Sequence, residues 1–147
     1  MFKNILVPID GSALSRKAIR RAVQLAREQN ARVTGFHVGP AWSPKVYGDS
    51  TLTGYTSPAQ HSEIVRKTAM EHFSALKRAA AASRVECKCL YTEGDYPYEK
   101  IVKAAQKNRC DLIVMASHGR RGISRLLLGS ETSKVLAHSK VPVLVER

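Results

Sequence analysis

The chain has 147 residues and carries 24 lysines and arginines against 12 aspartates and glutamates, a formal net charge of +12 at neutral pH. This length predicts one domain over residues 1–147, able to build a core without disulfides or a structural metal. No apolar run approaches the ~20 residues that cross a bilayer, and the amino terminus lacks a signal-peptide pattern, so we predict a cytoplasmic protein with no membrane partner. The charge favours anionic partners, but the basic residues are dispersed, which makes nucleic acid a disfavoured one.

The beginning of the chain predicts two strands around one helix. The apolar run from Ile5 to Ile9 ends in the turn Asp10-Gly11-Ser12 and indicates a buried strand. Apolar residues then recur at helical spacing over 13–29, with Ser12 as the expected N-cap. Arg32–Val38 predicts the second strand.

A long segment rich in glycine and proline follows, over residues 39–57. Loops of this length in compact domains are usually functional or mobile. The aromatic residues Trp42, Tyr47 and Tyr55 within it either cover a ligand or patch the surface of the domain, and the sequence favours neither interpretation.

The rest of the chain alternates helices and strands, and the expected elements are a helix over 59–82, a strand from Arg84 to Tyr91, a helix over 98–108, a strand over Asp111–Ala116, a helix over about 130–138 and a strand over Val141–Val145. Such alternation predicts an α/β fold with a parallel sheet covered on both faces. We therefore expect a doubly wound, Rossmann-like sheet of five strands, for which we assume the order 3-2-1-4-5.

The cysteines and histidines suggest little chemistry. An odd number of cysteines without a secretion signal favours free thiols. Cys87 and Cys89 point to the same side of one strand, either as a redox or metal pair or, as we favour, as small residues beside the core. No histidines show metal-ligand spacing, and His61 and His72 are expected to be solvated on their helix.

Two strand exits are the most polar and glycine-bearing in the chain. In a doubly wound sheet, ligands bind where the strand order reverses, which the assumed order places between the first and fourth strands. There the turn at Asp10-Gly11-Ser12 would meet the loop that begins at Ser117. Gly119 and Gly122 permit positive φ and leave room for close backbone approach, and the N–H groups at Gly129-Ser130 would begin a helix that can bind phosphate. The alternative is that these residues only form turns and an N-cap.

Particular segments make the chain resemble the universal stress protein family over almost its whole length. These are the opening strand and turn from Ile5 to Ser12, the segment from Asp111 to Gly119, and the closing segments Leu127–Ser130 and Val141–Val145. The ATP-binding branch of that family has a glycine, two residues, a glycine, nine residues, then glycine followed by serine or threonine. Gly119, the interval 120–128 and Gly129-Ser130 match this pattern, while Ala116 stands at the first glycine position.

The resemblance implies an adenine-nucleotide alpha hydrolase-like fold and an ATP site, with Mg²⁺ as an optional companion. It places Asp10, Pro8 and Ile9 beside the adenine, and Val38 as an apolar wall. The residues that it places along the ribose and phosphates are Met115, Ala116, His118, Gly119, Gly129, Ser130, Glu131 and Thr132. It also implies a homodimer formed through the strand Val141–Val145, an apolar strand that we expect at a sheet edge. Arg120, Arg121 and Arg125 are additional candidates for phosphate contacts.

The chain lacks the P-loop motif of nucleotide-hydrolysing enzymes, the glycine motif of dinucleotide-dependent dehydrogenases and the nucleophile elbow, and we see no positioned base for attack on a phosphate. We therefore predict a nucleotide-binding stress or signalling protein without rapid catalysis and with no assigned catalytic residue. Two alternatives remain open. One is an ATP-free interaction module, and the other is a slow ATPase or autophosphorylating protein with Ser124, Ser130 or Thr132 as acceptor.

Overall fold

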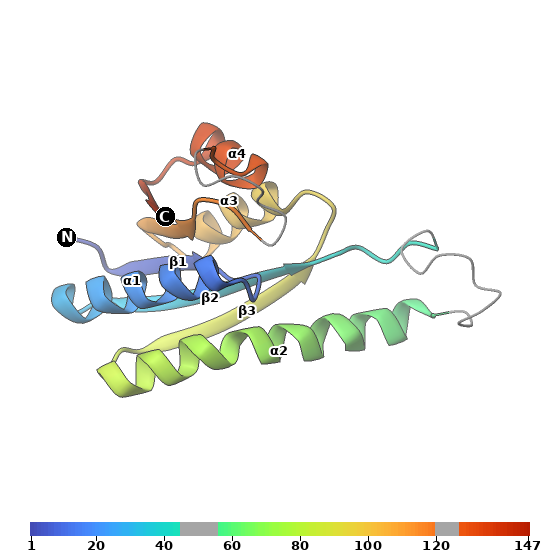
Figure 1. The fold of residues 1–147 in the computed structure, drawn as a ribbon, viewed down its shortest axis with the longest axis horizontal. Helices are drawn as coiled ribbons and strands as arrows, with labels where there is room; N and C mark the ends of the chain where they lie inside the picture. The colour runs from blue at the N-terminus through green and yellow to red at the C-terminus, as the bar shows by residue number, and fades with distance from the viewer. Residues whose placement is uncertain (45–55, 120–126) are drawn as a thin grey trace.

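The fold is a parallel sheet of five strands in the order β3-β2-β1-β4-β5, as predicted (Figure 1). The computed structural model describes residues 1–44, 56–119 and 127–147. The strands are β1 (Asn4–Pro8), β2 (Arg32–Gly39), β3 (Cys87–Glu93), β4 (Leu112–Ala116) and β5 (Val143–Glu146). β1 lies at the centre, where Ile5 pairs with Val33 of β2 on one side and with Leu112 of β4 on the other.

Helices cover both faces of the sheet, because each crossover returns over one face or the other. The helices are α1 (Ala13–Gln29), α2 (Pro58–Ser83), α3 (Pro97–Lys107) and α4 (Ser130–His138). α1 and α2 pack on one face, through a core that includes Ile19, Phe73 and Leu76. α3 and α4 pack on the other face, around Ile101 and Val135. No helix in the described residues is both long enough and apolar enough to cross a bilayer.

The ends of the helices follow local sequence signals. The Ser12 hydroxyl accepts the N–H of Ser15 at 3.0 Å, which is the predicted N-cap of α1. α2 begins at Pro58, one residue earlier than expected, because Ser57 and Gln60 form a reciprocal capping box in front of it.

The third strand begins later than the sequence indicates. Arg84 was expected to start it, but this residue ends α2 in a left-handed conformation, with φ of 56°. The apolar residue Val85 is buried in the turn and not in the strand, which is why hydrophobicity placed the boundary too early. The last strand likewise begins at Val143 and not at Val141, since Pro142 precedes it.

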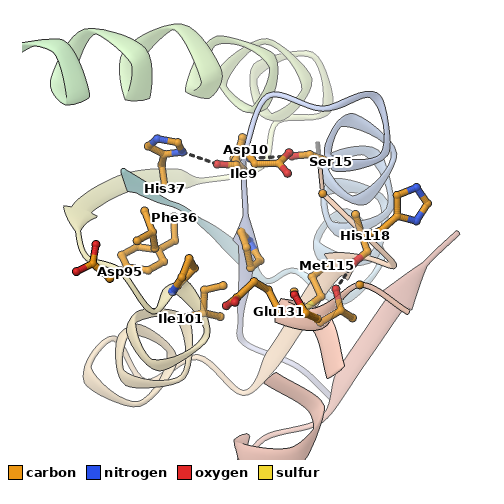
Figure 2. A pocket seen from close by; sticks show the side chains of 18 residues that line it. Ile9, Asp10, Ser15, Phe36, His37, Asp95, Ile101, Met115, His118 and Glu131 are labelled. Atoms are coloured by element: carbon orange, nitrogen blue, oxygen red, sulfur yellow. Dashed lines mark hydrogen bonds between the residues drawn. The ribbon is translucent and has the colours of Figure 1, made fainter. Parts of the chain in front are cut away.

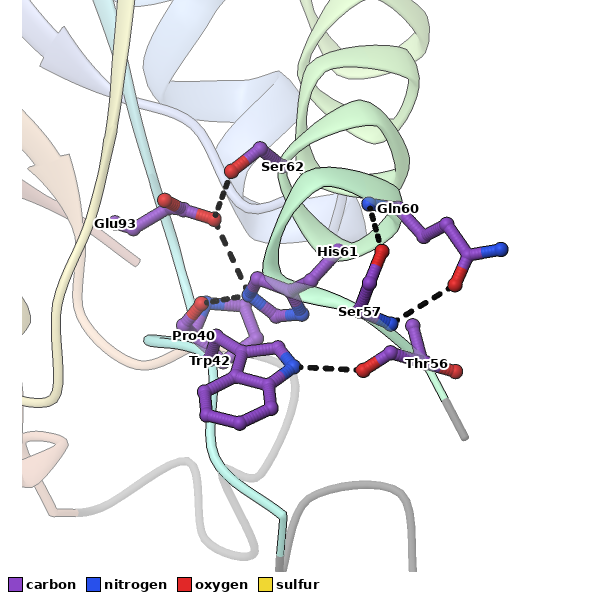
Figure 3. Close-up of polar contacts among 8 residues, drawn as sticks. All are labelled: Pro40, Trp42, Thr56, Ser57, Gln60, His61, Ser62 and Glu93. Carbon is purple, nitrogen blue, oxygen red and sulfur yellow. Dashed lines mark hydrogen bonds and ion pairs between the residues drawn. The ribbon is translucent and has the colours of Figure 1, made fainter. Parts of the chain in front are cut away.

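The expectation that His61 and His72 are solvated is wrong. His61 is 1% exposed, and its Nε2 lies 2.7 Å from the carbonyl oxygen of Pro40 and 3.2 Å from a carboxylate oxygen of Glu93 (Figure 3). Both partners are acceptors, so Nε2 carries the hydrogen. His72 is half-buried, and its ring meets that of His37 edge-on at 4.9 Å.

His61 therefore ties the first turn of α2 to the exits of β2 and β3. Nearby, the indole Nε1 of Trp42 donates to the carbonyl of Thr56 at 2.8 Å, which joins the two described ends of the long loop (Figure 3). Trp42 thus serves the packing of this loop base. Tyr47 and Tyr55 lie outside the described residues.

The two strand cysteines lie beside the core. Cys87 and Cys89 are free, half-buried and packed against the cluster under α1 and α2. Burial, helped by the neighbouring Cys87, raises the pKa of the Cys89 thiol to about 11. At neutral pH this thiol is therefore protonated.

We predict that His61→Ala destabilises the protein by about 2–4 kcal/mol, because the buried ring is lost and the Pro40 carbonyl loses its donor. The exposed Lys67 of the same helix provides the control, since Lys67→Ala should change the free energy of unfolding by no more than about 0.5 kcal/mol. Denaturant unfolding of both variants measures this, and equal stabilities would contradict the structural role of His61.

Candidate functional site

A cavity of about 480 Å³ opens at the carboxyl ends of β1 and β4, where the strand order reverses (Figure 2). Its volume lies within the range of small-molecule sites. All twelve residues that the family resemblance placed along a nucleotide line it: Pro8, Ile9, Asp10, Val38, Met115, Ala116, His118, Gly119, Gly129, Ser130, Glu131 and Thr132. The topology explains this convergence, because the carboxyl ends of all parallel strands lie at the same end of the sheet.

The turn after β1 is built around the Asp10 carboxylate. Its Oδ1 accepts the N–H of Ser12 at 2.9 Å, and the backbone N–H of Asp10 donates to the Ser15 hydroxyl at 3.3 Å. Gly11 turns the chain with φ of +80°, and a Cβ there would lie 2.5 Å from Nε2 of His72. Asp10 is thus held by its own turn, beside the N-cap Ser12.

Close packing, and not positive φ, explains the glycines of the second loop. Gly11 is the one glycine with positive φ in the described residues, so Gly119 does not use the positive φ that glycine permits, and of its two expected roles close approach remains. A Cβ on Gly119 would lie 2.6 Å from Oδ2 of Asp10. Gly122 lies outside the described residues.

Gly129 brings the start of α4 against the loop after β4. Its N–H donates to the carbonyl of Ser117 at 2.7 Å, and a Cβ there would lie 3.0 Å from Cα of His118. Larger side chains would push these two backbones apart. Gly129 therefore sets the distance between the amino end of α4 and the end of β4.

Ala116 occupies the first glycine position of the pattern without strain. It is the last residue of β4, pairs with Glu146 of β5, and its φ is not positive. Its carbonyl accepts the hydroxyl hydrogen of the buried Thr132 at 2.9 Å. This buried bond holds the first turn of α4 against the end of β4.

The carboxylate of Glu131 is engaged by the neighbouring helix. Its Oε2 accepts the N–H of Tyr98 at 2.8 Å, in the first turn of α3, whose N-cap Tyr96 makes no side-chain bond. Its Oε1 lies 3.7 Å from Nζ of Lys134. Glu131 lines the cavity, yet its charge is partly neutralised by a helix end and an ammonium group.

Sequence reasoning missed part of the lining, namely Ser15, Phe36, His37, Asp95, Pro97 and Ile101. Phe36 and His37 precede Val38 at the end of β2, and the His37 ring Nδ1 lies 2.7 Å from the Ile9 carbonyl oxygen. Asp95 and Pro97 follow β3. An analysis of the residues after every strand, and not only after the first and fourth strands, would have identified Asp95 and Pro97 as candidates.

Charge is distributed unevenly in this site. Among the described lining residues the carboxylates of Asp10, Asp95 and Glu131 occur without any lysine or arginine, although the chain is strongly basic. The candidates Arg120, Arg121 and Arg125 lie outside the described residues. Within residues 1–44, 56–119 and 127–147, no group of three or more histidine, cysteine or acidic side chains could hold a metal ion.

The family model of universal stress proteins matches residues 1–147. The chain belongs to the universal stress protein family. Among curated relatives of this family, universal stress protein YxiE of Bacillus subtilis is 37% identical over the full length of both chains. Universal stress protein MJ0531 of Methanocaldococcus jannaschii is 34% identical, over 99% of this chain and 82% of its own.

Solved structures of universal stress proteins share the fold. UspA of Lactobacillus plantarum superposes with a TM-score of 0.75, at 28% identity, over 99% of this chain and 97% of its own. A universal stress protein in complex with cAMP superposes with a TM-score of 0.67, at 26% identity, over 98% and 95% of the two chains.

We predict that Thr132→Val lowers the free energy of unfolding by about 1–2 kcal/mol, since the buried Ala116 carbonyl loses its hydroxyl donor at almost unchanged side-chain volume. Thr132→Ser retains the hydroxyl and should recover part of the loss. Thermal or denaturant unfolding distinguishes the two, and a valine variant as stable as the parent would contradict this role of the Thr132 hydroxyl.

Proposed function

We propose that the protein binds an adenine nucleotide, ATP in particular, in the cavity between β1 and β4, and acts as a stress-response or signalling protein without rapid catalysis. The observation that carries this proposal is the placement of Gly129. It fits the start of α4 directly against the loop after β4, so that the first residues of the helix line the same cavity as the apolar strand ends. Apolar walls with a few polar groups are typical of small-molecule sites.

The base would lie against the apolar part of the lining. Val38, Ile101 and Met115 supply apolar side chains to it, and Asp10 and His37 add polar atoms. An adenine needs such a slot with one or two hydrogen-bonding groups. The solved complex of a 26% identical universal stress protein with cAMP supports an adenine nucleotide as the ligand class.

The phosphates would lie at the amino end of α4. Ser130 is the first residue of this helix and is exposed, and Gly129 before it adds no side chain. The first N–H groups of a helix have no partners within the helix, and the helix dipole favours an anion at this end. A phosphate chain would thus be held by backbone N–H groups and hydroxyls.

Mg²⁺ would be held mainly by the phosphates. The described lining offers Asp10 and Glu131 near this end, but both carboxylates already accept backbone N–H groups. The same engagement argues against either carboxylate as a general base for hydrolysis, because a base must be able to take the proton of the attacking water. We therefore propose binding, and at most slow turnover.

Ser130→Glu tests the phosphate end. A carboxylate at the first position of α4 suits the helix dipole, so the fold is retained, but it repels phosphate. We expect ATP to bind the parent one to one in calorimetry, and the variant to bind ATP at least about tenfold more weakly. Affinity for adenosine, which carries no phosphate, should remain unchanged.

Ser133→Glu is the matched control, because Ser133 is exposed on the same helix and does not line the cavity. It should bind ATP like the parent. A second variant, Gly129→Val, should abolish binding by forcing α4 away from His118. The proposal fails if the parent gives no saturable signal with ATP, with or without Mg²⁺, or if Ser130→Glu binds ATP unchanged.

We also infer a homodimer formed through β5. This strand lies at the edge of the sheet, with β4 on one side only, and Val143, Leu144 and Val145 are half-buried in the single chain. An apolar edge strand presents unpaired backbone groups to a second copy. Pairing of two copies there would cover both the backbone and these side chains.

Sedimentation at micromolar concentration tests the dimer. Val145→Lys places an ammonium group in the proposed interface, where two copies would repel each other, so we expect it to shift a dimeric parent to monomer. Tyr91→Lys alters the opposite edge strand, β3, at an exposed position and should leave the dimer intact. A parent that sediments as a monomer would contradict the inference.

A further inference from the structure

A second hollow, of about 380 Å³, lies at the end of the sheet opposite to the first cavity, where the strands begin. It is lined by basic side chains from separate parts of the chain: Lys3 before β1, Arg27 in the last turn of α1, Arg32 at the start of β2, Arg84 after α2 and Arg109 after α3. The ends of α1 and α2 lie near the amino terminus, at the left of Figure 1. The fold thus gathers cations that are far apart in sequence.

These basic side chains have no protein partner in the described residues. Elsewhere, Arg21 pairs with Glu146, Arg66 with Glu63, and Lys88 donates to Asn108. None of the five lining cations makes an ion pair or a side-chain hydrogen bond within the part of the chain that the structure describes. Their donors are therefore available to a ligand.

Acidic groups near the hollow do not cancel this charge. Glu86 lines it, and the carboxylate of Asp111 lies close by, where it accepts the backbone N–H groups of Lys3 and Asn4. The carboxyl ends of α1, α2 and α3 add partial negative charge. Basic residues near the carboxyl end of a helix can be explained by their favourable interaction with the helix dipole alone. Two of these residues, however, occupy backbone positions at which another type of residue would make the protein more stable.

The backbone conformation after three helices is an observation independent of the charges. Each of α1, α2 and α3 is followed by a left-handed residue: Asn30 with φ of 54°, Arg84 with 56° and Arg109 with 52°. Glycine, and then asparagine, is the residue that this conformation favours after a helix. The chain has arginine at two of the three positions, and both line the hollow. An arginine in this less favoured conformation points to a function for its side chain.

We propose that this hollow binds a compact polyphosphate anion. Guanidinium groups match phosphate oxygens in pairs, and several of them converge here. No aromatic residue is among the lining residues that the structure describes, so none of them would stack on a nucleobase. The concave shape and limited volume favour a short phosphate chain over a flat lipid surface or an extended nucleic acid. The shared chemistry is the phosphate chain, whether free or part of a nucleotide.

Tripolyphosphate is the probe, titrated by calorimetry into the full chain that carries Gly129→Val, so that the cavity at α4 does not compete. We expect saturable one-to-one binding that weakens with added salt. The double variant Arg84→Gly/Arg109→Gly should bind at least about tenfold more weakly. The same double variant should unfold at a higher temperature, because glycine relieves the left-handed backbone.

Matched controls separate the hollow from general charge. Lys17→Ala/Arg20→Ala removes two charges from exposed positions of α1 outside the hollow and should bind tripolyphosphate within about twofold of the parent. Asn30→Gly relieves the third left-handed position without removing charge. It should raise the unfolding temperature, and although Asn30 lines the hollow, tripolyphosphate binding should change far less than in Arg84→Gly/Arg109→Gly.

Several outcomes would overturn the proposal. Equal losses in both double variants would mean that only net charge matters. Unsaturable binding would exclude a defined site. Tighter binding of ATP than of tripolyphosphate would show that a base is recognised, and tighter binding of duplex DNA would assign the surface to nucleic acid.

Discussion

The pairing of β1 with β4 at the centre of the sheet is the constraint on which the rest of the structure depends. Ile5 and Leu6 align with Leu112 and Ile113, although more than a hundred residues separate them along the chain. This pairing reverses the direction in which strands are added, so the connections after β1 and β4 leave toward opposite faces. The space that opens between them cannot be filled by a crossover helix. A cavity at this place is therefore a consequence of strand order, and the residues around it need only keep it open.

Glycines and short polar side chains keep it open. Gly119 lies against Asp10, Gly129 against His118, and Thr132 bonds the end of β4 from below. At Gly119 and Gly129 a larger side chain would not fit, and the Thr132 hydroxyl holds the first turn of α4 against β4. The geometry of the cavity is thus set by two close approaches and one buried hydrogen bond.

Much of this arrangement could be predicted from the sequence. Buried strands such as Leu112–Ala116 are continuous apolar runs, and the alternation of strands and helices fixes the class of fold. The positions around the cavity followed from strand exits and from the family pattern at Gly119 and Gly129-Ser130. Hydrophobicity failed where an apolar residue such as Val85 is buried in a turn, because burial alone does not identify a strand.

Other features could not be predicted because they depend on contacts between distant elements. Nothing local to His61 shows that Pro40 and Glu93 lie beside it, so a histidine on a long helix is taken for a solvated one. Nor does the sequence around Glu131 reveal that its carboxylate accepts a hydrogen bond from the first turn of α3. Such pairings are decided by how helices pack, and the pattern of one segment carries no information on them.

The bond between Glu131 and Tyr98 has a mechanical consequence. The second residue of α4 supplies the cap that α3 lacks on its own, so the two helices share one terminal hydrogen bond. Any shift of α4 would leave the beginning of α3 uncapped, and any tilt of α3 would pull on α4. Glu131 also lines the cavity, so one carboxylate belongs both to the cavity wall and to the beginning of α3.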